Sequence, residues 1–368
     1  MLKTMGLIMT NYSAGSFGSL TEDRPIATLP FGGRYRLIDF PLSNIVNSRI
    51  NTVGIITPYM YRSLMDHVGA GKEWMIRRKT GGMFFLPGSI YGVKSQSHSK
   101  FLLRDIILNR SYLERSNDDV VVVTGSNKIF NIDFRRVVKA HAEAGADITL
   151  VYKPDYVPCE APEQYLNLSS HGRVIGFNSE PDENANCFMD AFVISRELLL
   201  KFMSWYSALD YMDLTDIFAE NMDKVKINAY SFEGYMGSVN GLASYLQANL
   251  DLLKEDVRHE LFTSGHRIRT KVSDAPPARY QPTADVRNSL VSTGCSVSGT
   301  VINSIVFRGA QIAEGAVVKN CIVMQKGVIG EGAELENVIL DKYCTIKPGV
   351  RLNGLAESPL AIGKKEIV

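Results

Sequence analysis

The sequence predicts an α/β protein in which a mostly parallel sheet, with helices on both faces, is followed by a left-handed parallel β-helix. Strand-like and helix-like segments alternate through residues 1–240, an order typical of a parallel sheet covered by helices. A repeat of fixed period fills the C-terminal part, and such a repeat indicates a solenoid. Between the two parts, the adjacent Pro276 and Pro277 mark a linker.

Length, composition and charge define the class of protein. The 368 residues are enough for two domains with full-sized cores. With 40 Lys and Arg against 39 Asp and Glu, the net charge is +1, so no global field attracts nucleic acid or acidic membranes. The five cysteines are odd in number and lack metal-ligand spacing, which favours reduced thiols. The apolar run Met5–Met9 is too short for a signal peptide or a membrane span, so we expect a soluble, cytoplasmic protein.

The first part of the chain alternates between strands and helices. Each predicted strand is a short run of mostly apolar residues, and the helical stretches between them are longer. Helices are expected at Phe101–Arg115 and Phe134–Ala144. Strands are expected at Met5–Met9, Thr52–Thr57, Val120–Thr124, Ile148–Tyr152 and Phe188–Ile194.

The C-terminal repeat begins each unit with an asparagine. Asn303, Asn320 and Asn337 begin three units of equal length, and a shorter copy begins at Asn288. Isoleucine and glycine each recur at one aligned position of these units. Short aliphatic strands with glycine at the corners cannot bury their faces alone, so successive coils must stack. About three six-residue sides per turn suit a left-handed parallel β-helix, whereas the alternative is a β-sandwich with chance spacing.

These signals divide the chain into three segments. Residues 1–242 are predicted to form the sheet domain, 243–285 a connecting helix with a linker, and 286–368 the β-helix. The connecting helix is predicted from the helical spacing of Ala243–Asp256, and the linker from the prolines within Asp274–Arg279.

One segment is long and specific enough to indicate a family. Phe31–Ile50 reads FGGRYRLIDFPLSNIVNSRI and closely resembles the FGGKYRIIDFxLSNxxNSGI signature of glucose-1-phosphate adenylyltransferases. Further similar segments are Tyr245–Leu252, Ile268–Thr270 and Asn288–Gly299, so the resemblance covers the whole chain. It implies a Rossmann-like nucleotidyltransferase domain followed by a left-handed β-helix, in agreement with the patterns above.

Enzymes of this family join ATP and glucose 1-phosphate, which releases pyrophosphate and gives ADP-glucose for glycogen or starch. Displacement at the α-phosphorus needs groups that neutralise the triphosphate, carboxylates that hold Mg²⁺ and a pocket for the sugar phosphate. The triphosphate groups are altered here. Where the family has GGxGxRL, Asn11–Ser19 has no arginine and carries the bulky Phe17. Ile26 stands where a family lysine acts on the phosphates.

The metal and sugar positions are altered as well. The family aspartates of GDH and YWRDVGT fall on Ser126 and Ser238. Two neutral hydroxyls are poor substitutes for carboxylates, so the resemblance implies no productively bound Mg²⁺ and no other metal. The sugar-phosphate lysine of FxEKP falls on Glu180, whose charge repels that substrate. We therefore expect no catalytic residue, and Ile26, Ser126, Glu180 and Ser238 to be degenerate family positions.

The adenine side departs from the family pattern too. The small residues of the GTADA stretch fall on Lys100–Arg104, where the side chains are large. The paired glutamines of the family fall on Gly88 and Ser89. The resemblance therefore predicts a cleft whose ligand contacts have been replaced on every side.

Several polar residues have ordinary structural explanations. The six histidines are scattered, and none follows His266, which argues against the catalytic histidine of acyltransferase β-helices. Asp213 and Asp216 are interpreted as helix-capping or surface acids. For Arg34 and Arg36, two interpretations stay open. In the family, such residues lie near the β-helix, where effector phosphates bind, but ion pairs within the subunit are the alternative.

An intact scaffold with altered ligand motifs predicts a catalytically silent, regulatory subunit of glucose-1-phosphate adenylyltransferase in glycogen biosynthesis. The resemblance implies that its partner is a homologous catalytic subunit in a hetero-oligomer, a tetramer, whose allosteric response it tunes. A homo-oligomer is expected when the chain is alone, and neither nucleic acid nor a membrane is expected as a partner. The alternatives are a weakly active adenylyltransferase and a stand-alone sensor of sugar phosphates.

Overall fold

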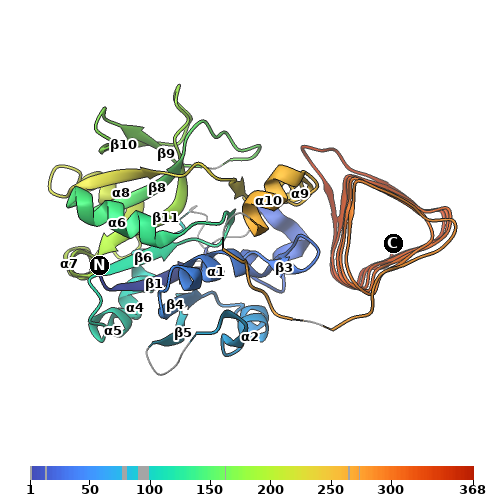
Figure 1. Cartoon of the computed structure of the whole chain (residues 1–368), viewed down its shortest axis with the longest axis horizontal. Coiled ribbons are helices and arrows are strands. Elements are labelled where there is room, and N and C mark those ends of the chain that lie inside the picture. Colours follow the sequence, from blue (N-terminus) through green and yellow to red (C-terminus); the bar gives the residue numbers. More distant parts are fainter. Residues whose placement is uncertain are drawn as a thin grey trace.

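The computed structural model describes residues 2–12, 15–76, 81–89, 99–161, 163–263, 266–272 and 274–368. Figure 1 shows its two parts, a sheet flanked by helices and a triangular coil seen end-on. The predicted fold class, a mostly parallel sheet domain followed by a left-handed β-helix, is confirmed.

The central sheet, within the described part of the chain, has nine strands in the order β10-β9-β11-β6-β1-β4-β5, with β8 beside β11 and β12 beside β8. The strands β6, β1, β4 and β5 run parallel, whereas β11 is antiparallel to β6 and β8. All five predicted strands form, because their aliphatic runs are buried on both faces of the sheet. The strands are β1 (Thr4–Met9), β4 (Thr52–Thr57), β5 (Gly82–Pro87), β6 (Val120–Thr124), β8 (Ile148–Lys153), β9 (Tyr165–Leu168), β10 (Val174–Asn178), β11 (Cys187–Ser195) and β12 (Ile227–Ser231).

Helices cover both faces of this sheet and form two separate cores. One face carries α4 (Leu103–Leu108), α5 (Arg110–Glu114), α7 (Arg196–Trp205) and α8 (Leu214–Glu220), and the other carries α1 (Asp39–Asn47), α2 (Arg62–Val68) and α6 (Phe134–Ala144). The bounds predicted for α6 are those observed, since Asp133 caps its start and Gly145 ends it in a left-handed conformation.

One predicted helix is divided in two. The segment Phe101–Arg115 forms α4 and α5, which are separated at Asn109. The amide of Asn109 donates to the carbonyls of Asp105 and Pro87, both at 2.8 Å. Such side-chain bonds to the backbone compete with helix continuation, and the apolar spacing of the sequence does not report them.

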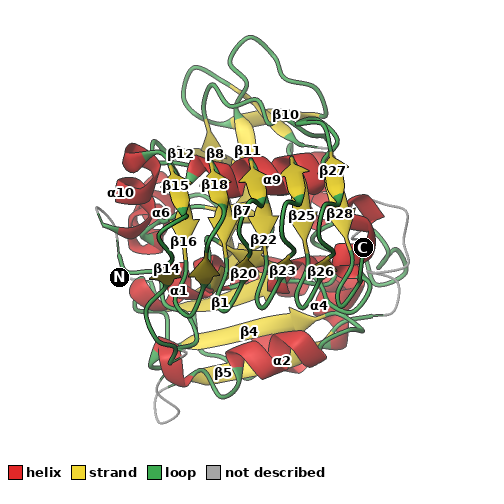
Figure 2. Cartoon of the chain, turned by 90° about the vertical axis from the view of Figure 1, so that its right-hand side faces the viewer, coloured by secondary structure: helices red, strands yellow, loops and turns green. Residues whose placement is uncertain are grey.

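The β-helix consists of three sheets of five parallel strands each, stacked side by side in Figure 2. Ile305, Ile322 and Ile339 pair in register, which confirms the fixed period of the repeat. Asn288 begins the shorter coil, which ends where Asn303 begins the next one, so Leu290 pairs with Ile305 across fewer residues of sequence than Ile305 with Ile322. The strands are β14 (Arg279–Tyr280), β17 (Ser296–Val297), β20 (Gln311–Ile312), β23 (Val328–Ile329) and β26 (Thr345–Ile346); β15 (Asp285–Arg287), β18 (Thr300–Ile302), β21 (Val317–Lys319), β24 (Glu334–Glu336) and β27 (Arg351–Asn353); β16 (Leu290–Val291), β19 (Ile305–Val306), β22 (Ile322–Val323), β25 (Val338–Leu340) and β28 (Leu360–Ile362).

The repeating asparagines turn the chain at one corner of each coil. Asn288, Asn303, Asn320 and Asn337 all have a positive φ, between 41° and 54°. Asparagine tolerates this left-handed conformation better than other residues with a side chain. The asparagine recurs in the sequence because each of these corners needs a residue that tolerates a positive φ. The aliphatic residues that follow it fill the interior of the coil.

A third core joins the two parts. It contains Phe17, Phe31 and Tyr245 from the first part, together with Phe307 and Met324 of the β-helix. The helices α9 (Leu242–Asp251) and α10 (Glu255–Phe262) lie at this junction (Figure 1). The two parts are therefore packed against one another through apolar side chains.

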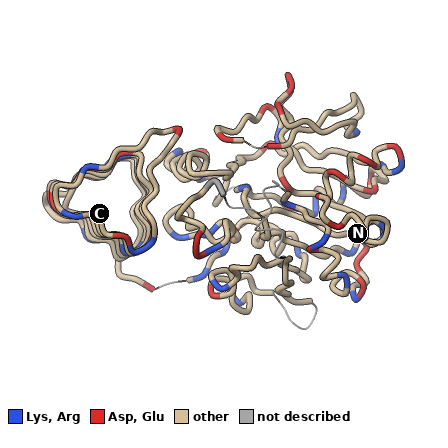
Figure 3. Tube along the Cα trace, turned by 180° about the vertical axis from the view of Figure 1, so that it is seen from behind, with Lys and Arg blue, Asp and Glu red and all other residues tan. Residues whose placement is uncertain are grey.

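Charge is distributed evenly over this fold. Lys and Arg residues are interspersed with Asp and Glu along both parts (Figure 3), in keeping with the net charge of +1. In the described ranges, no helix combines the length and the apolar character needed to cross a bilayer.

Candidate functional site

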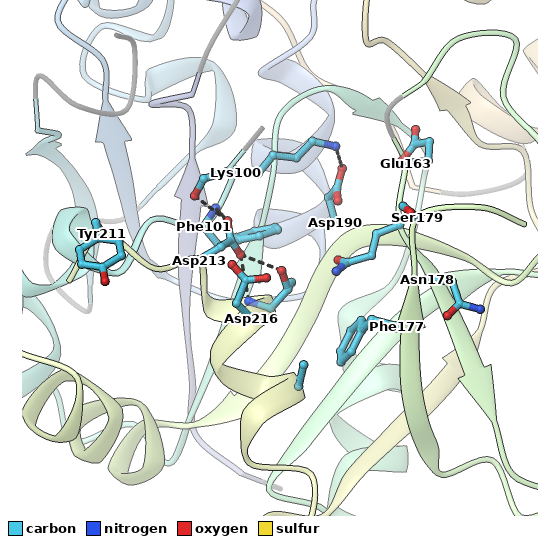
Figure 4. A pocket seen from close by; sticks show the side chains of 14 residues that line it. Lys100, Phe101, Glu163, Phe177, Asn178, Ser179, Asp190, Tyr211, Asp213 and Asp216 are labelled. Atoms are coloured by element: carbon cyan, nitrogen blue, oxygen red, sulfur yellow. Dashed lines mark hydrogen bonds and ion pairs between the residues drawn. The ribbon is translucent and has the colours of Figure 1, made fainter. Parts of the chain in front are cut away.

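A cavity of about 530 Å³ lies where the chain leaves β10 and enters α4 and α8. Figure 4 shows the side chains around it, which come from segments far apart in the sequence. Its lining includes Lys100, Phe101, Gln164, Phe177, Asp190 and Asp216. Aromatic, amide and carboxylate groups therefore meet there with a single lysine from the described lining.

A chain of ion pairs runs along the inner wall of this cavity. Lys128, on β7 (Lys128–Ile129), is buried, and its Nζ lies 2.7 Å from Glu163 and 3.5 Å from Asp190. Burial alone would lower the pKa of Lys128, but Asp190 and Glu163 raise it well above its usual value. Lys100 reaches Asp190 from the other side at 2.6 Å (Figure 4). Each cation of this wall is thus matched by a carboxylate of the same chain.

Asp190 adopts an unusual backbone conformation within β11. Its φ is +50°, and the pairing of β11 with β8 is irregular between Phe188 and Phe192. The carbonyl of Asp190 accepts a hydrogen bond from the N–H of Gly125 at 2.7 Å. Left-handed backbone at a residue other than glycine is unfavourable and is held by its surroundings. The carboxylate of Asp190 contacts the ammonium groups of Lys100 and Lys128, at 2.6 and 3.5 Å.

The two serines at the expected metal positions are bonded to protein groups. Ser126 is fully buried, and its Oγ donates to the carbonyl of Met9 at 3.2 Å and contacts the Tyr12 hydroxyl at 2.7 Å. Burial raises the pKa of Tyr12, so this hydroxyl stays neutral. The Oγ of Ser238, on β13 (Gly237–Ser238), donates to the carboxylate of Glu163.

These residues do not fit a Mg²⁺ ion. Mg²⁺ takes carboxylate oxygens in octahedral geometry, and Glu163 is the carboxylate that Ser238 contacts. Glu163 already accepts hydrogen bonds from Lys128 at 2.7 Å and from the amide of Asn240 at 2.9 Å. A divalent cation bound by Glu163 and Asp190 would lie beside the buried ammonium of Lys128, which repels it.

The second half of the segment expected to meet the triphosphate packs against the β-helix. η1 (Gly15–Thr21) contacts β28, and Phe17 and Leu20 are buried in the third core with Phe307 of the β-helix. Ile26, on η2 (Ile26–Thr28), belongs to the same core. Ser13 and Ala14, within the same predicted loop, lie outside the described residues. The bulk of Phe17 is therefore used for packing between the two parts.

The residues at the family's sugar-phosphate and adenine positions also lie in solvent or contact other side chains of this chain. Glu180 is exposed beyond the end of β10, whereas its neighbours Asn178 and Ser179 line the cavity. Phe101 is buried with its ring edge-on to Phe192, at 5.2 Å between ring centroids. Arg104 forms two hydrogen bonds to Asp210, at 2.6 and 2.8 Å. The large side chains of the Lys100–Arg104 stretch thus make internal contacts.

A second polar cluster lies beside the first. The amide of Asn11 donates to the Asp105 carboxylate and the N–H of Ser89 does the same, both at 2.7 Å. Burial raises the pKa of Asp105 despite these bonds. The N–H of Gly88 donates to the carbonyl of Thr57 at 2.9 Å. Here too, groups at the predicted ligand-binding wall bond to one another.

The remaining sequence predictions concern polar residues beside the cavity and in the core. Asp213 caps α8, as predicted, by accepting hydrogen bonds from the N–H and hydroxyl of Thr215 at 2.9 Å. Asp216 is exposed, as predicted for a surface acid, and both aspartates also line the cavity. His67 is bonded to Asp39 at 2.6 Å in the core, and His98 lies outside the described residues.

The two arginines singled out in the sequence lie in different surroundings. Arg36 donates to the carbonyl and hydroxyl of Ser63, at 2.8 and 3.0 Å. Burial, with a contribution from Arg24, lowers the pKa of Arg36 to about 10. Arg34 lies over the ring of Tyr35, 5.4 Å from its centroid. Within the described residues, neither guanidinium forms an ion pair with a carboxylate.

Arg36 belongs to a group of cations at the junction of the two parts. Burial and then the nearby Arg36 and Arg24 lower the pKa of Lys342, which lies on the β-helix, to about 7. Arg24 forms a buried ion pair with Asp341. We name Arg24, Arg36 and Lys342 the junction cluster. Among the described residues, Arg24 is the member of this cluster that has an ion pair with a carboxylate.

Comparison with known proteins shows which chains share this plan. The "Nucleotidyl transferase" family model matches residues 6–255, and the model described as "GlmU-like, C-terminal hexapeptide" matches residues 276–356. The glycogen biosynthesis protein GlgD of Bacillus subtilis (strain 168) is 34% identical over 360 residues, which span 98% of this chain and 95% of that protein. GlgD of Geobacillus stearothermophilus is 34% identical over 86% of this chain and 83% of its own length. The glucose-1-phosphate adenylyltransferase of the same organism is 32% identical over the same shares of the two chains.

Proposed function

The chain belongs to the glucose-1-phosphate adenylyltransferase family, and we propose from this premise that it is a catalytically silent subunit that regulates an active homologue. Its relatives support a role in glycogen biosynthesis. The proposal concerns the finer points, namely the absence of turnover, the partner and the response to effectors.

The proposal rests on the cavity of about 530 Å³, the cleft, where the lysines are paired with carboxylates of the same chain. Nucleotidyl transfer needs free cations to offset the triphosphate and carboxylates to hold Mg²⁺. In this chain Lys100 and Lys128 are paired with Asp190 and Glu163, and the two positions of the family aspartates carry Ser126 and Ser238. Loss of one charge-stabilising group typically lowers the rate by ~10²–10³. Several such losses together support a silent chain over a weakly active adenylyltransferase, which stays the second candidate.

The intact junction between the two parts supports a regulatory role. A subunit changes the activity of its partner through contacts that differ between the partner's states. In the junction cluster, Arg36 and Lys342 add positive charge beyond the pair of Arg24 with Asp341, and this composition suits a phosphorylated effector. We propose that an effector bound there acts on the third core, since Arg24 and Asp341 belong to different parts of the chain.

The ends of the β-helix supply a candidate surface for the catalytic partner. Strands β14, β15 and β16 are the terminal strands of the three sheets, and Arg279, Tyr280, Asp285 and Arg287 among them are exposed. An unpaired strand edge is a template for association with another chain. We propose a hetero-oligomer, a tetramer, with a homologous glucose-1-phosphate adenylyltransferase.

Mixing the two subunits tests this proposal. The chain is combined at increasing ratios with the glucose-1-phosphate adenylyltransferase from the organism that encodes this chain. Complex formation is followed by size-exclusion chromatography with light scattering. We expect a hetero-oligomer whose turnover or effector sensitivity differs from that of the catalytic subunit alone. Arg36→Ala should leave the complex intact and reduce the effector response, whereas the exposed control Lys139→Ala should change neither. Absence of a complex, with unchanged kinetics at every ratio, would contradict the proposal. A complex without any kinetic change would leave only a structural subunit.

A further inference from the structure

The described lining of the cleft is rich in carboxylates and poor in cations. Lys100 is its basic residue, and its acidic residues are Glu163, Asp190, Asp213 and Asp216. We propose that the cleft binds an uncharged saccharide, such as a hexose or the end of a short oligosaccharide, and discriminates against a phosphorylated sugar. This inference goes beyond the proposed function, and it depends on neither the catalytic partner nor the effector site.

The surplus of negative charge in the cleft disfavours a phosphorylated ligand. Lys100 and the buried Lys128 are already paired with Asp190 and Glu163. Asp213 and Asp216 add two further carboxylates, and the described lining holds no further cation to offset them. A phosphoryl group carries about two negative charges near pH 7, and charges of the same sign repel one another. An uncharged sugar enters the same cleft without this repulsion.

Asp216 is the carboxylate of this lining that is accessible to a ligand. It lies in the first turn of α8 and is exposed, and it forms no ion pair with a described residue. The neighbouring Asp213 is used within the fold, since it accepts hydrogen bonds from the hydroxyl of Ser99 and the N–H of Phe101, both at 2.8 Å. An ionised carboxylate only accepts hydrogen bonds, and a bond from an O–H group to it is about twice as strong as one between neutral groups. A sugar offers such O–H donors around its ring, so it matches this surplus of acceptors.

Two uncharged side chains of the lining are available as well. Gln164 directly precedes β9 and Ser179 directly follows β10, and both line the cavity. Among the described residues, neither side chain has a hydrogen-bond partner. An amide group and a hydroxyl can each donate and accept, as the hydroxyls of a sugar do. These side chains can therefore bind a sugar without adding charge to the cleft.

Aromatic rings lie on two sides of these polar groups. Phe177, on β10, is half-buried, and Tyr211 is 64% exposed. Both line the cavity, and Figure 4 shows them on opposite sides of Asp216. The C–H groups on the face of a sugar ring pack favourably against the negative face of an aromatic ring. The volume of about 530 Å³ lies within the range of about 300–1,000 Å³ that is usual for small-molecule sites. The cleft therefore combines apolar and hydroxyl-binding contacts in a space that admits a saccharide.

Ligand-observed NMR titration of the isolated full chain tests the proposal. The probes are methyl α-glucoside, maltose and glucose 1-phosphate, of which the first and the last share a ring and differ in the anomeric substituent. The variant Tyr211→Ala/Asp216→Asn removes one ring and one carboxylate from the cleft. Its matched control, Asp256→Asn/Tyr280→Ala, removes an exposed acid from the first turn of α10 and an exposed tyrosine from the β-helix.

We expect both uncharged sugars to bind the parent and the control saturably. Binding to the cleft variant should be at least about tenfold weaker, since one hydrogen bond to a charged group is worth about that factor. Glucose 1-phosphate should bind the parent at least about tenfold more weakly than methyl α-glucoside does. The single variant Asp216→Asn should weaken the uncharged sugars and strengthen glucose 1-phosphate, because it removes both an acceptor and a negative charge. Circular dichroism and thermal melts check that each variant is folded.

The outcomes separate the ligand classes and the sites. Equal binding of methyl α-glucoside and maltose assigns the affinity to a single hexose, and tighter binding of maltose assigns it to an oligosaccharide end; both support the proposal. Absence of saturable binding of either uncharged sugar to the parent, or binding to the cleft variant within about twofold of the parent, overturns it. Equal weakening in the two double variants places the sugar outside the cleft and also overturns it. Glucose 1-phosphate that binds the parent as tightly as methyl α-glucoside would show that the cleft does not discriminate by charge, which contradicts the proposal.

Discussion

The cleft and the junction cluster both hold positive charge, but they differ in whether a carboxylate of the chain pairs with it. In the cleft, Lys100 and Lys128 each contact a carboxylate of the same chain. At the junction, Arg36 and Lys342 repel one another, and burial lowers the pKa of both. Matched charge needs no ligand, whereas an anion stabilises partly buried cations that have no ion pair with a carboxylate. The difference is in keeping with the proposed absence of turnover in the cleft and with the proposed effector site at the junction.

The largest effect is expected from unpairing the buried lysine of the cleft. Glu163→Gln keeps the shape of the side chain and its contacts to Ser238 and Asn240, but it leaves Lys128 with the longer contact to Asp190. Removing one partner of a buried ion pair lowers the free energy of unfolding by about 3–5 kcal/mol. The exposed control Glu143→Gln, whose pair with Lys139 spans 3.7 Å, should change it by less than ~0.5 kcal/mol. Urea denaturation at pH 7 measures both, and equal effects would contradict the matched-charge account.

The next effect is a loss of stability in acid. Burial raises the pKa of Glu163, but the nearby Lys128 and Lys100 lower it by a larger amount. The resulting pKa is about 2, against about 4.3 in an unfolded chain. The folded state therefore binds fewer protons, so this contribution is complete above about pH 5 and is lost as the pH falls toward 2. Each unit of the shift corresponds to about 1.4 kcal/mol. Urea midpoints between pH 7 and pH 3 should fall more steeply for the parent than for Glu163→Gln. If the urea midpoints of the parent and of Glu163→Gln fell equally with pH, Glu163 would not be the source of the loss of stability in acid.

At the junction, the charge of Lys342 is expected to destabilise the fold rather than to stabilise it. The folded pKa of Lys342 is about 7, against about 10.4 unfolded, so the unfolded state binds more protons between pH 7 and 10. Stability should therefore rise with pH in this window, and Lys342→Met should remove the rise. At pH 7 the variant should be more stable than the parent, because it removes the cost of burying the ammonium group and its repulsion by Arg36 and Arg24. Lys319→Met, an exposed lysine paired with Glu336 on the same β-helix, is the control. A destabilised Lys342→Met would show that the lysine is favourably placed.

The smallest effect is expected from restoring the family carboxylates. Ser126→Asp with Ser238→Asp returns two acids, but Lys128 stays beside Glu163 and Phe17 stays packed against the β-helix. We therefore expect no measurable ADP-glucose from this variant with ATP, glucose 1-phosphate and Mg²⁺, provided that circular dichroism shows it folded. An efficient enzyme from these two changes alone would mean that the rest of the cleft is still competent.

Periodic features of the fold could be predicted from the sequence. The equal spacing of Asn303, Asn320 and Asn337 and the aliphatic strands report repeated local requirements, and the structure has them where expected. The break at Asn109 was missed because it depends on a carbonyl of Pro87 in a distant strand. The sequence also does not show that Phe17 packs against the β-helix.

The site could be predicted only where a motif marks the position. Ser126 and Ser238 stand out because the family signature fixes what should be there. Lys128, Glu163 and Asp190 were missed, because their pairing exists only after β7 and β11 come together. A lysine directly before Ile129 and Phe130, close behind an apolar strand, was the available signal.

The turnover of the isolated chain tests the central claim most directly. The purified protein is incubated with ATP, glucose 1-phosphate and Mg²⁺, with and without candidate effectors, beside the glucose-1-phosphate adenylyltransferase of the same organism as a positive control. ADP-glucose is quantified by chromatography. A cleft neutralised by its own carboxylates predicts no product above background, whereas a turnover number within about tenfold of the control enzyme, a gap smaller than the loss of one charge-stabilising group, would contradict it.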